Sequence, residues 1–217
     1  MVTGRRNRAA VGAALGLWAA LAGTVLAEET PSPFADPLVQ RELVAAARGT
    51  VEAIVRRQPV PPLSTEAPPC CRERRAVFVT LEVGGALRGC RGSLWPVTDS
   101  VTAEVRRMAE GATTRDRRYR PLRAEELARL EVTITIIERL EPIAGVALLG
   151  GPEHGLVVRS GDRLGVVLPY EGKAPETRLT WGIKKAGLRA SESFTLERLV
   201  GQRFSSRPTS GAAGAPR

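Results

Sequence analysis

Cys90 is the residue of this sequence whose surroundings most clearly allow chemistry, because it lies between arginines and glycines in the stretch LRGCRG, 87–92. On an extended strand, Arg88 and Cys90 project to the same face. A guanidinium group beside a thiol stabilises the thiolate and lowers the pKa of the thiol. Gly89 and Gly92 place no side chain next to the sulfur, so a ligand can approach closely. The stretch predicts a catalytic nucleophile, Cys90, or a binding notch at Arg88, Gly89 and Gly92.

A buried structural cysteine is the alternative interpretation of this stretch, since free cysteine is among the most buried residue types. Thiol catalysis also needs a base within hydrogen-bond reach of the sulfur. No candidate base is near Cys90 in the sequence, and the single histidine, His154, precedes Gly155 at a predicted turn. The missing base favours binding over catalysis.

A second polar stretch, RDRRYR at 115–120, holds further candidate binding residues. Arg115, Asp116 and Tyr119 are predicted to form a polar wall beside Cys90, with the Asp116 carboxylate holding an arginine in bidentate geometry. The alternative is that Asp116 caps the loop and the arginines are solvated.

The other two cysteines, Cys70 and Cys71, follow two prolines. A disulfide between one of them and Cys90 is possible in an exported protein, and three unpaired thiols are the alternative. The chain has no CxxC stretch and only one histidine. We therefore expect no metal site and no other cofactor.

The N-terminal segment, 1–27, has the features of an export signal. Its start carries Arg5, Arg6 and Arg8, residues 9–27 carry no charge, and the segment ends in Val-Leu-Ala. Small residues at that end are typical of a signal-peptidase site. The sequence predicts export to the periplasm, and an uncleaved N-terminal membrane anchor is the alternative.

Charge gives a weaker indication of partners. The formal net charge of +9 falls to +6 when the three arginines of the signal are removed. A basic exported domain can contact an anionic envelope surface. No basic run is interleaved with stacking aromatic residues, so no nucleic-acid partner is expected.

The elements that must position Cys90 mix helices and strands without a regular βαβ alternation, which indicates an α+β domain. Gly84-Gly85 predicts a hairpin turn, with Val79 and Leu81 packed inward. Turn residues, proline and apolar spacing predict the other elements, which are helices at 38–57, 98–112, 124–130 and 175–188, a strand at 131–140 and a hairpin at 155–169. The predicted organisation is a signal at 1–27, a flexible leader at 28–36, a domain at 37–204 and a disordered tail at 205–217.

Five stretches, in this order, resemble the AMMECR-type domain family: FVTLEVGGALRGCRGSL, RDRRYRPLRAEEL, LEVTITIIERLEPI, HGLVVRSGDRLGVVLP and KKAGL. The family pattern has an aliphatic residue at Arg91 and proline at Arg120. The resemblance implies an α+β fold with a mixed central sheet flanked by helices and a smaller lobe. It implies no settled activity. It does imply a partner, because relatives are associated with Memo-type and radical-SAM proteins.

Residues and resemblance together predict an exported accessory module that binds a ligand or partner through LRGCRG. Two alternatives stay open. One is a thiol enzyme with Cys90 as its nucleophile, and the other is a structural protein of the cell envelope.

Export has a direct test. N-terminal sequencing of the native protein should start at Glu28, because signal peptidase cuts after the small residue Ala27. Intact Met1 on protein recovered from the cytoplasm would contradict the prediction.

Overall fold

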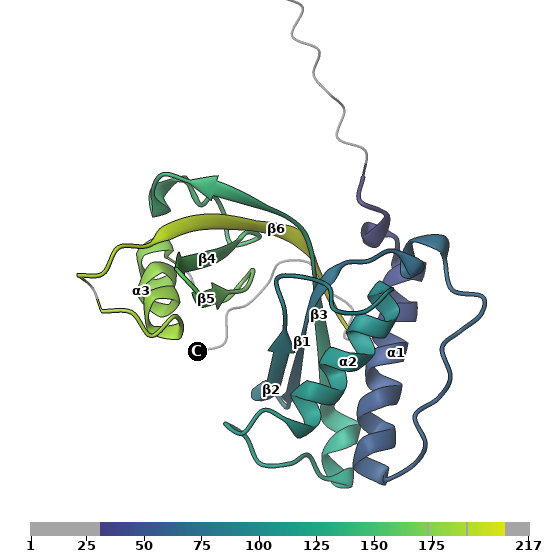
Figure 1. Ribbon diagram of the computed structural model, residues 1–217. Coiled ribbons are helices and arrows are strands. Elements are labelled where there is room, and N and C mark those ends of the chain that lie inside the picture. Colours follow the sequence, from purple (N-terminus) through teal and green to yellow (C-terminus); the bar gives the residue numbers. More distant parts are fainter. Residues whose placement is uncertain (1–30, 173, 190, 207–217) are drawn as a thin grey trace, which may run out of the picture. The chain divides into compact units, whose positions relative to one another are not determined.

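The computed structural model describes residues 31–172, 174–189 and 191–206. Their helices are α1 (Pro37–Arg56), α2 (Val101–Thr114) and α3 (Pro175–Lys185), with short 3-10 turns at Pro33–Ala35, Pro69–Arg72, Ala124–Arg129 and Val146–Leu148. The strands are β1 (Ala76–Val83), β2 (Ala86–Gly92), β3 (Leu130–Ile143), β4 (Gly155–Ser160), β5 (Arg163–Val167) and β6 (Thr195–Ser205). They form one sheet in the order β2-β1-β3-β6-β4-β5, and neighbouring strands are antiparallel (Figure 1).

The first half of the sheet packs against α1 and α2, which lie side by side (Figure 1). β1 and β2 are joined at Gly84 and Gly85, whose φ values of 59° and 82° lie in the left-handed region that glycine adopts freely. Val79 and Leu81 are fully buried in the core beneath the helices. The predicted hairpin and its inward-facing residues are confirmed.

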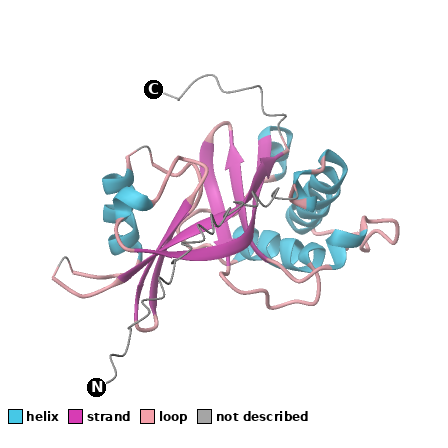
Figure 2. Cartoon of the chain, turned by 90° about the horizontal axis from the view of Figure 1, so that it is seen from above, coloured by secondary structure: helices cyan, strands magenta, loops and turns pink. Residues whose placement is uncertain are grey.

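The second half consists of β4, β5 and α3 around a core of its own, and Figure 2 shows helices at both ends of the sheet. Helix α3 approaches the sheet very closely at two glycines. A Cβ atom on Gly165 would lie 1.8 Å from the carbonyl oxygen of Gly182, and one on Gly182 would lie 2.5 Å from Val158. Any larger residue at either glycine would push the helix away from the sheet.

The two long strands β3 and β6 run through both halves (Figure 1). In their pairing Ile137 is opposite Gly201 and Arg139 is opposite Val200, so Glu138 is an extra residue without a partner. Such a bulge bends the strand that carries it. A Cβ atom on Gly201 would lie 2.0 Å from the carbonyl oxygen of Ile136, so the strands approach closely beside the bulge.

Several sequence-based expectations change. The α+β class is confirmed, but the described sheet is antiparallel, whereas the resemblance implied a mixed one. Strand β6 was not predicted. Within the segment expected to be a flexible leader, Phe34 is buried in a 3-10 turn and Asp36 caps α1. The expected signal lies outside the described residues, as does the expected tail beyond Ser206. No helix in the described part of the chain is long and apolar enough to span a membrane.

Replacing Gly201 tests the close strand approach. Gly201→Ala should lower the free energy of unfolding by about 1–3 kcal/mol, because the new methyl group meets backbone that cannot move aside. Gly145→Ala is the matched control, since Gly145 has an extended φ of −170° and open space around it. Urea titration should show little change for the control, or stabilisation of up to about 1 kcal/mol. Equal effects of the two variants would contradict the account.

Candidate functional site

Cys90 lies on the face of the sheet that points away from α1 and α2. It is opposite Thr80 in the register of β1 and β2, and Thr80 alternates with the helix-facing residues Val79 and Leu81. The Thr80 hydroxyl donates to the sulfur of Cys90 over 3.4 Å. Thr133 and Ser205 are the next residues in the same register, so a polar row crosses four strands.

Burial dominates the ionisation of Cys90 and raises its pKa. The Thr80 hydrogen bond and the positive charges of Lys185 and Arg118 lower the pKa by smaller amounts, and Glu171 raises it. Desolvation disfavours the charged thiolate. Cys90 is therefore a neutral thiol at pH 7, unlike the low-pKa nucleophile that the sequence allowed.

Arg88 is not among the groups with the largest effects on the pKa of Cys90, so the structure does not support the prediction that it lowers that pKa. Gly89 pairs with Leu81 and Leu87 pairs with Glu82, so Arg88 is an extra residue in β2. This bulge breaks the alternation of side chains and redirects Arg88. Its guanidinium forms an ion pair with Glu126 and donates to the carbonyl oxygen of Arg120 over 3.1 Å.

The glycines of LRGCRG have packing partners. A Cβ atom on Gly89 would lie 2.3 Å from the carbonyl oxygen of Ala112 in α2. One on Gly92 would lie 2.2 Å from the ring of Phe78. The absence of side chains lets a helix and an aromatic ring approach the strand, so the space expected for a ligand is filled by the protein itself. Gly89 also lies on the opposite face of the sheet from Cys90.

Asp116 is the residue that links the loop after α2 to Cys90. Its carboxylate accepts the backbone N–H of Cys90 over 2.9 Å and two N–H groups of Arg118 over 2.8 and 2.6 Å. The carboxylate is 5% exposed, and the Arg118 hydrogen bond is the main reason why its pKa falls to about 2. Asp116 thus holds an arginine in bidentate geometry, as predicted, and fixes Arg118 beside the thiol.

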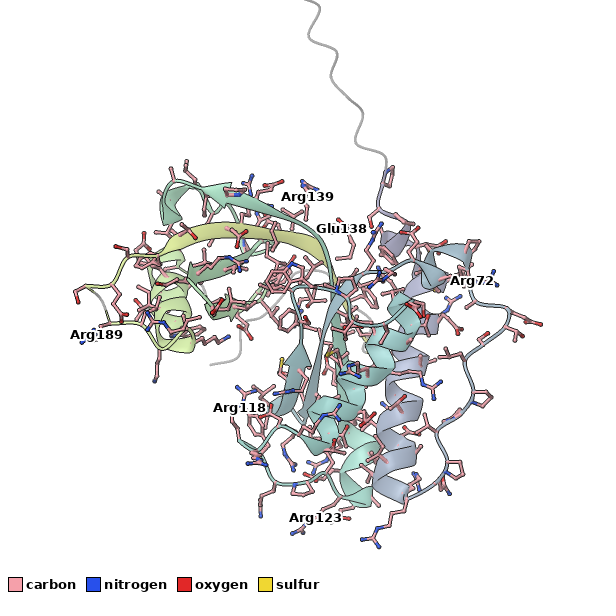
Figure 3. The ribbon with its side chains drawn as sticks, in the orientation of Figure 1. Arg72, Arg118, Arg123, Glu138, Arg139 and Arg189 are labelled. Atoms are coloured by element: carbon pink, nitrogen blue, oxygen red, sulfur yellow. The ribbon has the colours of Figure 1, made fainter. Side chains whose placement is uncertain are left out.

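The other residues predicted in this loop lie further out. Arg118 is 61% exposed, and its guanidinium lies 5.3 Å from the centre of the Tyr119 ring. Figure 3 shows Arg118 projecting from the loop after α2. Arg115 pairs with Glu110 over 3.1 Å at the surface. Tyr119 therefore contributes to the polar wall through Arg118, whereas Arg115 is tied to its own helix.

The second half of the chain contributes two charges that the sequence did not reveal. Lys185, in the last turn of α3, pairs with Glu171 over 2.7 Å. Both are close enough to act on the charge of Cys90. The site thus combines Cys90, Thr80, Asp116 and Arg118 with a Lys185–Glu171 pair, and we call it the thiol site.

The potential base with a large effect on Cys90 is Glu171, which is paired with Lys185. His154 is not among the groups with the largest effects on Cys90, and it lines a cavity of about 270 Å³ with Tyr170 and Arg203. Among the described residues, no cluster of three or more potential metal ligands occurs. Cys70, Cys71 and Cys90 are all unpaired, so the possible disulfide is not formed.

Comparison with known proteins finds a matching family model, related sequences and a similar solved structure. The family model described as AMMECR1 matches residues 44–208. A Methanosarcina barkeri protein is 36% identical over 63% of this chain and 70% of its own length. A Clostridium acetobutylicum protein is 32% identical over 58% of this chain, which spans only 27% of that longer relative. The crystal structure of an uncharacterised Pyrococcus horikoshii protein superposes with a TM-score of 0.68 at 26% identity, covering 75% of this chain and 89% of that one.

Acid titration tests the role of Asp116. A carboxylate whose pKa is lowered to about 2 stabilises the fold above its unfolded pKa near 4, and this stability is lost as the pH falls toward 2. The loss should be roughly 1–2 kcal/mol, because solvent screens the exposed Arg118. Asp116→Asn should remove this acid-dependent loss, whereas Asp162→Asn, in the exposed β4–β5 turn, should retain it. Identical unfolding curves from pH 4 to 2 for the two variants would contradict the assignment.

Proposed function

Because this chain belongs to the AMMECR1 family, we propose that it is an exported binding module that holds a ligand or partner protein at the thiol site without covalent chemistry. The proposal is supported chiefly by the state of Cys90. Burial raises the pKa of this thiol, and Glu171, a potential base among the groups with the largest effects on it, is paired with Lys185. A neutral thiol can take part in hydrogen bonding and packing but is a poor nucleophile.

The groups around the thiol suit recognition. Asp116 fixes the exposed guanidinium of Arg118, and the Lys185–Glu171 pair offers a second pair of charges. Fixed, partly solvated ion pairs can hydrogen-bond an incoming group at little entropic cost.

Exposed aromatic side chains lie next to the residues of the Lys185–Glu171 pair. Trp181 lies one helical turn before Lys185, and its ring lies against Gly172. Tyr170 is exposed beside Glu171, and Arg203 lies over its ring. Tryptophan, tyrosine and arginine are the residue types that most often dominate binding energy at protein interfaces. A protein partner therefore fits this surface better than a drug-sized molecule does.

The partner and its compartment are part of the proposal. The charged start and uncharged run of residues 1–27 support export, and an exported module would meet its partner in the cell envelope. A Memo-type or radical-SAM-associated protein is the partner class that the family resemblance implies. The basic net charge also favours contact with an anionic envelope surface.

A thiol enzyme is the second candidate, favoured by the positive charges of Lys185 and Arg118, which both lower the pKa of Cys90. The two candidates differ in what Cys90→Ser does. Serine keeps a small hydrogen-bonding group at this position but removes the nucleophilic sulfur. Binding should survive the substitution, whereas covalent turnover should not.

Capture from envelope extract tests the proposal, with the mature chain and its variants as immobilised bait. A partner retained by the unaltered chain should also be retained by Cys90→Ser. Arg118→Ala should weaken its binding roughly 30-fold, as expected for the loss of an interface arginine. Arg189→Ala is the matched control, because Arg189 is exposed on the loop after α3 (Figure 3). A covalent adduct on Cys90 that is absent from Cys90→Ser would instead support the enzyme.

A further inference from the structure

Arg88 lines a second pocket of the first half, where several arginines converge. We propose that this pocket binds a phosphate group carrying two negative charges. The pocket has a volume of about 240 Å³, and its charged residues are Arg88, Arg120, Arg123, Arg129, Glu125 and Glu126. We call it the arginine pocket. It exists because the β2 bulge turns Arg88 away from the register of the strand.

The inner part of the pocket is already neutralised. Arg88 pairs with Glu126, and both side chains are less than 20% exposed. The backbone N–H of Arg123 donates to Glu126 over 2.8 Å and, with Arg88, lowers the pKa of this carboxyl. Glu126 therefore stays ionised, and its carboxylate is already bound by Arg88 and by the backbone of Arg123. This ion pair holds Arg88 in a fixed position in the pocket.

The outer arginines are free to bind an anion. Within the described part of the chain, the guanidinium groups of Arg120 and Arg129 have no hydrogen bond and no ion pair. Arg123 lies 3.8 Å from Glu125, and both of these side chains are about 70% exposed. Four arginines and two glutamates leave the pocket with two excess positive charges.

The size and charge of the pocket define the ligand. A volume of about 240 Å³ is below the roughly 300–1,000 Å³ of drug-sized sites, so a small group fits it. Guanidinium groups bind phosphate oxygens in bidentate geometry. A phosphate monoester carries close to two negative charges at pH 7, which matches the two excess positive charges. The source is either a soluble phosphate ester or the phosphomonoester headgroup of a lipid.

This inference does not depend on the function proposed for the thiol site. Arg88 is not among the groups with the largest effects on the charge of Cys90, whereas Arg118 and Lys185 are. In Figure 3, Arg123 lies below Arg118, at the lower end of the half that contains α1 and α2. A variant of the arginine pocket can therefore fail to bind phosphate while partner capture at Arg118 continues.

Calorimetric titration of the mature chain with inorganic phosphate tests the pocket. Arg123→Gln combined with Arg129→Gln should weaken binding at least about tenfold, because two charge-assisted contacts are lost. Arg72→Gln combined with Arg189→Gln is the control, since it removes the same charge from exposed arginines elsewhere (Figure 3). No binding of phosphate, or equal weakening in both double variants, would overturn the inference.

Two further probes identify the source of the phosphate group. Sedimentation is measured with phosphatidylcholine vesicles that contain or lack phosphatidic acid, whose headgroup is a phosphomonoester. Glycerol 3-phosphate is then added as a soluble competitor. Vesicle binding that depends on Arg123 and Arg129 and resists the competitor indicates a lipid ligand. Binding of glycerol 3-phosphate that depends on the same arginines, with release of the vesicles, indicates a soluble ester.

Discussion

The pairing of β3 with β6 is the interaction on which the other features of this protein depend. These two strands are shared by the half covered by α1 and α2 and the half built on α3. The extra residue Glu138 bends β3, and Gly201 allows β6 to follow closely. A third apolar cluster, which includes Ala76, Ile137 and Leu199, packs residues from both halves together. Through this arrangement Glu171 and Lys185 come to act on Cys90, which is far away in the sequence.

Two opposing effects decide the chemistry at Cys90. Positive charges from Arg118 and Lys185 favour the thiolate, and burial favours the neutral thiol. Burial is the larger effect because both charges are already satisfied by carboxylates, Asp116 and Glu171. The result is a polar surface with fixed charges and an uncharged sulfur, which is suited to recognition. The bulge in β2 turns Arg88 away from the register of the strand. Its positive charge therefore lies in the arginine pocket, and Arg88 is not among the groups with the largest effects on the thiol.

Local signals in the sequence were sufficient for much of the fold. Paired glycines located both the β1–β2 turn and its inward-facing residues, and apolar spacing located α1 and α2. Strand β6 was not predicted, because several of its residues interrupt the alternation of apolar side chains. These are the central Gly201 and the charged residues Glu197, Arg198 and Arg203. The mixture of helices and strands without βαβ alternation indicated the fold class, and the family resemblance agreed with it but did not imply the antiparallel topology.

The site was harder to predict than the fold. Asp116 and its bidentate arginine could be anticipated, because a carboxylate among arginines has few other options. The direction of the Arg88 side chain could not be predicted. Side chains stop alternating between the two faces of a strand at a bulge, and no local residue pattern indicates where a bulge will form. Glu171 and Lys185 could not be found either, since they are far from Cys90 in the sequence and act on it only in the folded chain.

The pKa of the Cys90 thiol is the most direct test of the central claim that this cysteine is a neutral binding group. Alkylation by iodoacetamide is followed across the pH range, and the Cys90 peptide is quantified by mass spectrometry so that Cys70 and Cys71 do not contribute. We expect a midpoint above the ordinary value of about 8.5 that is the same in Arg88→Ala. A midpoint clearly below about 8.5 that rises in Arg88→Ala would contradict it, because Cys90 would then be a thiolate stabilised by that arginine.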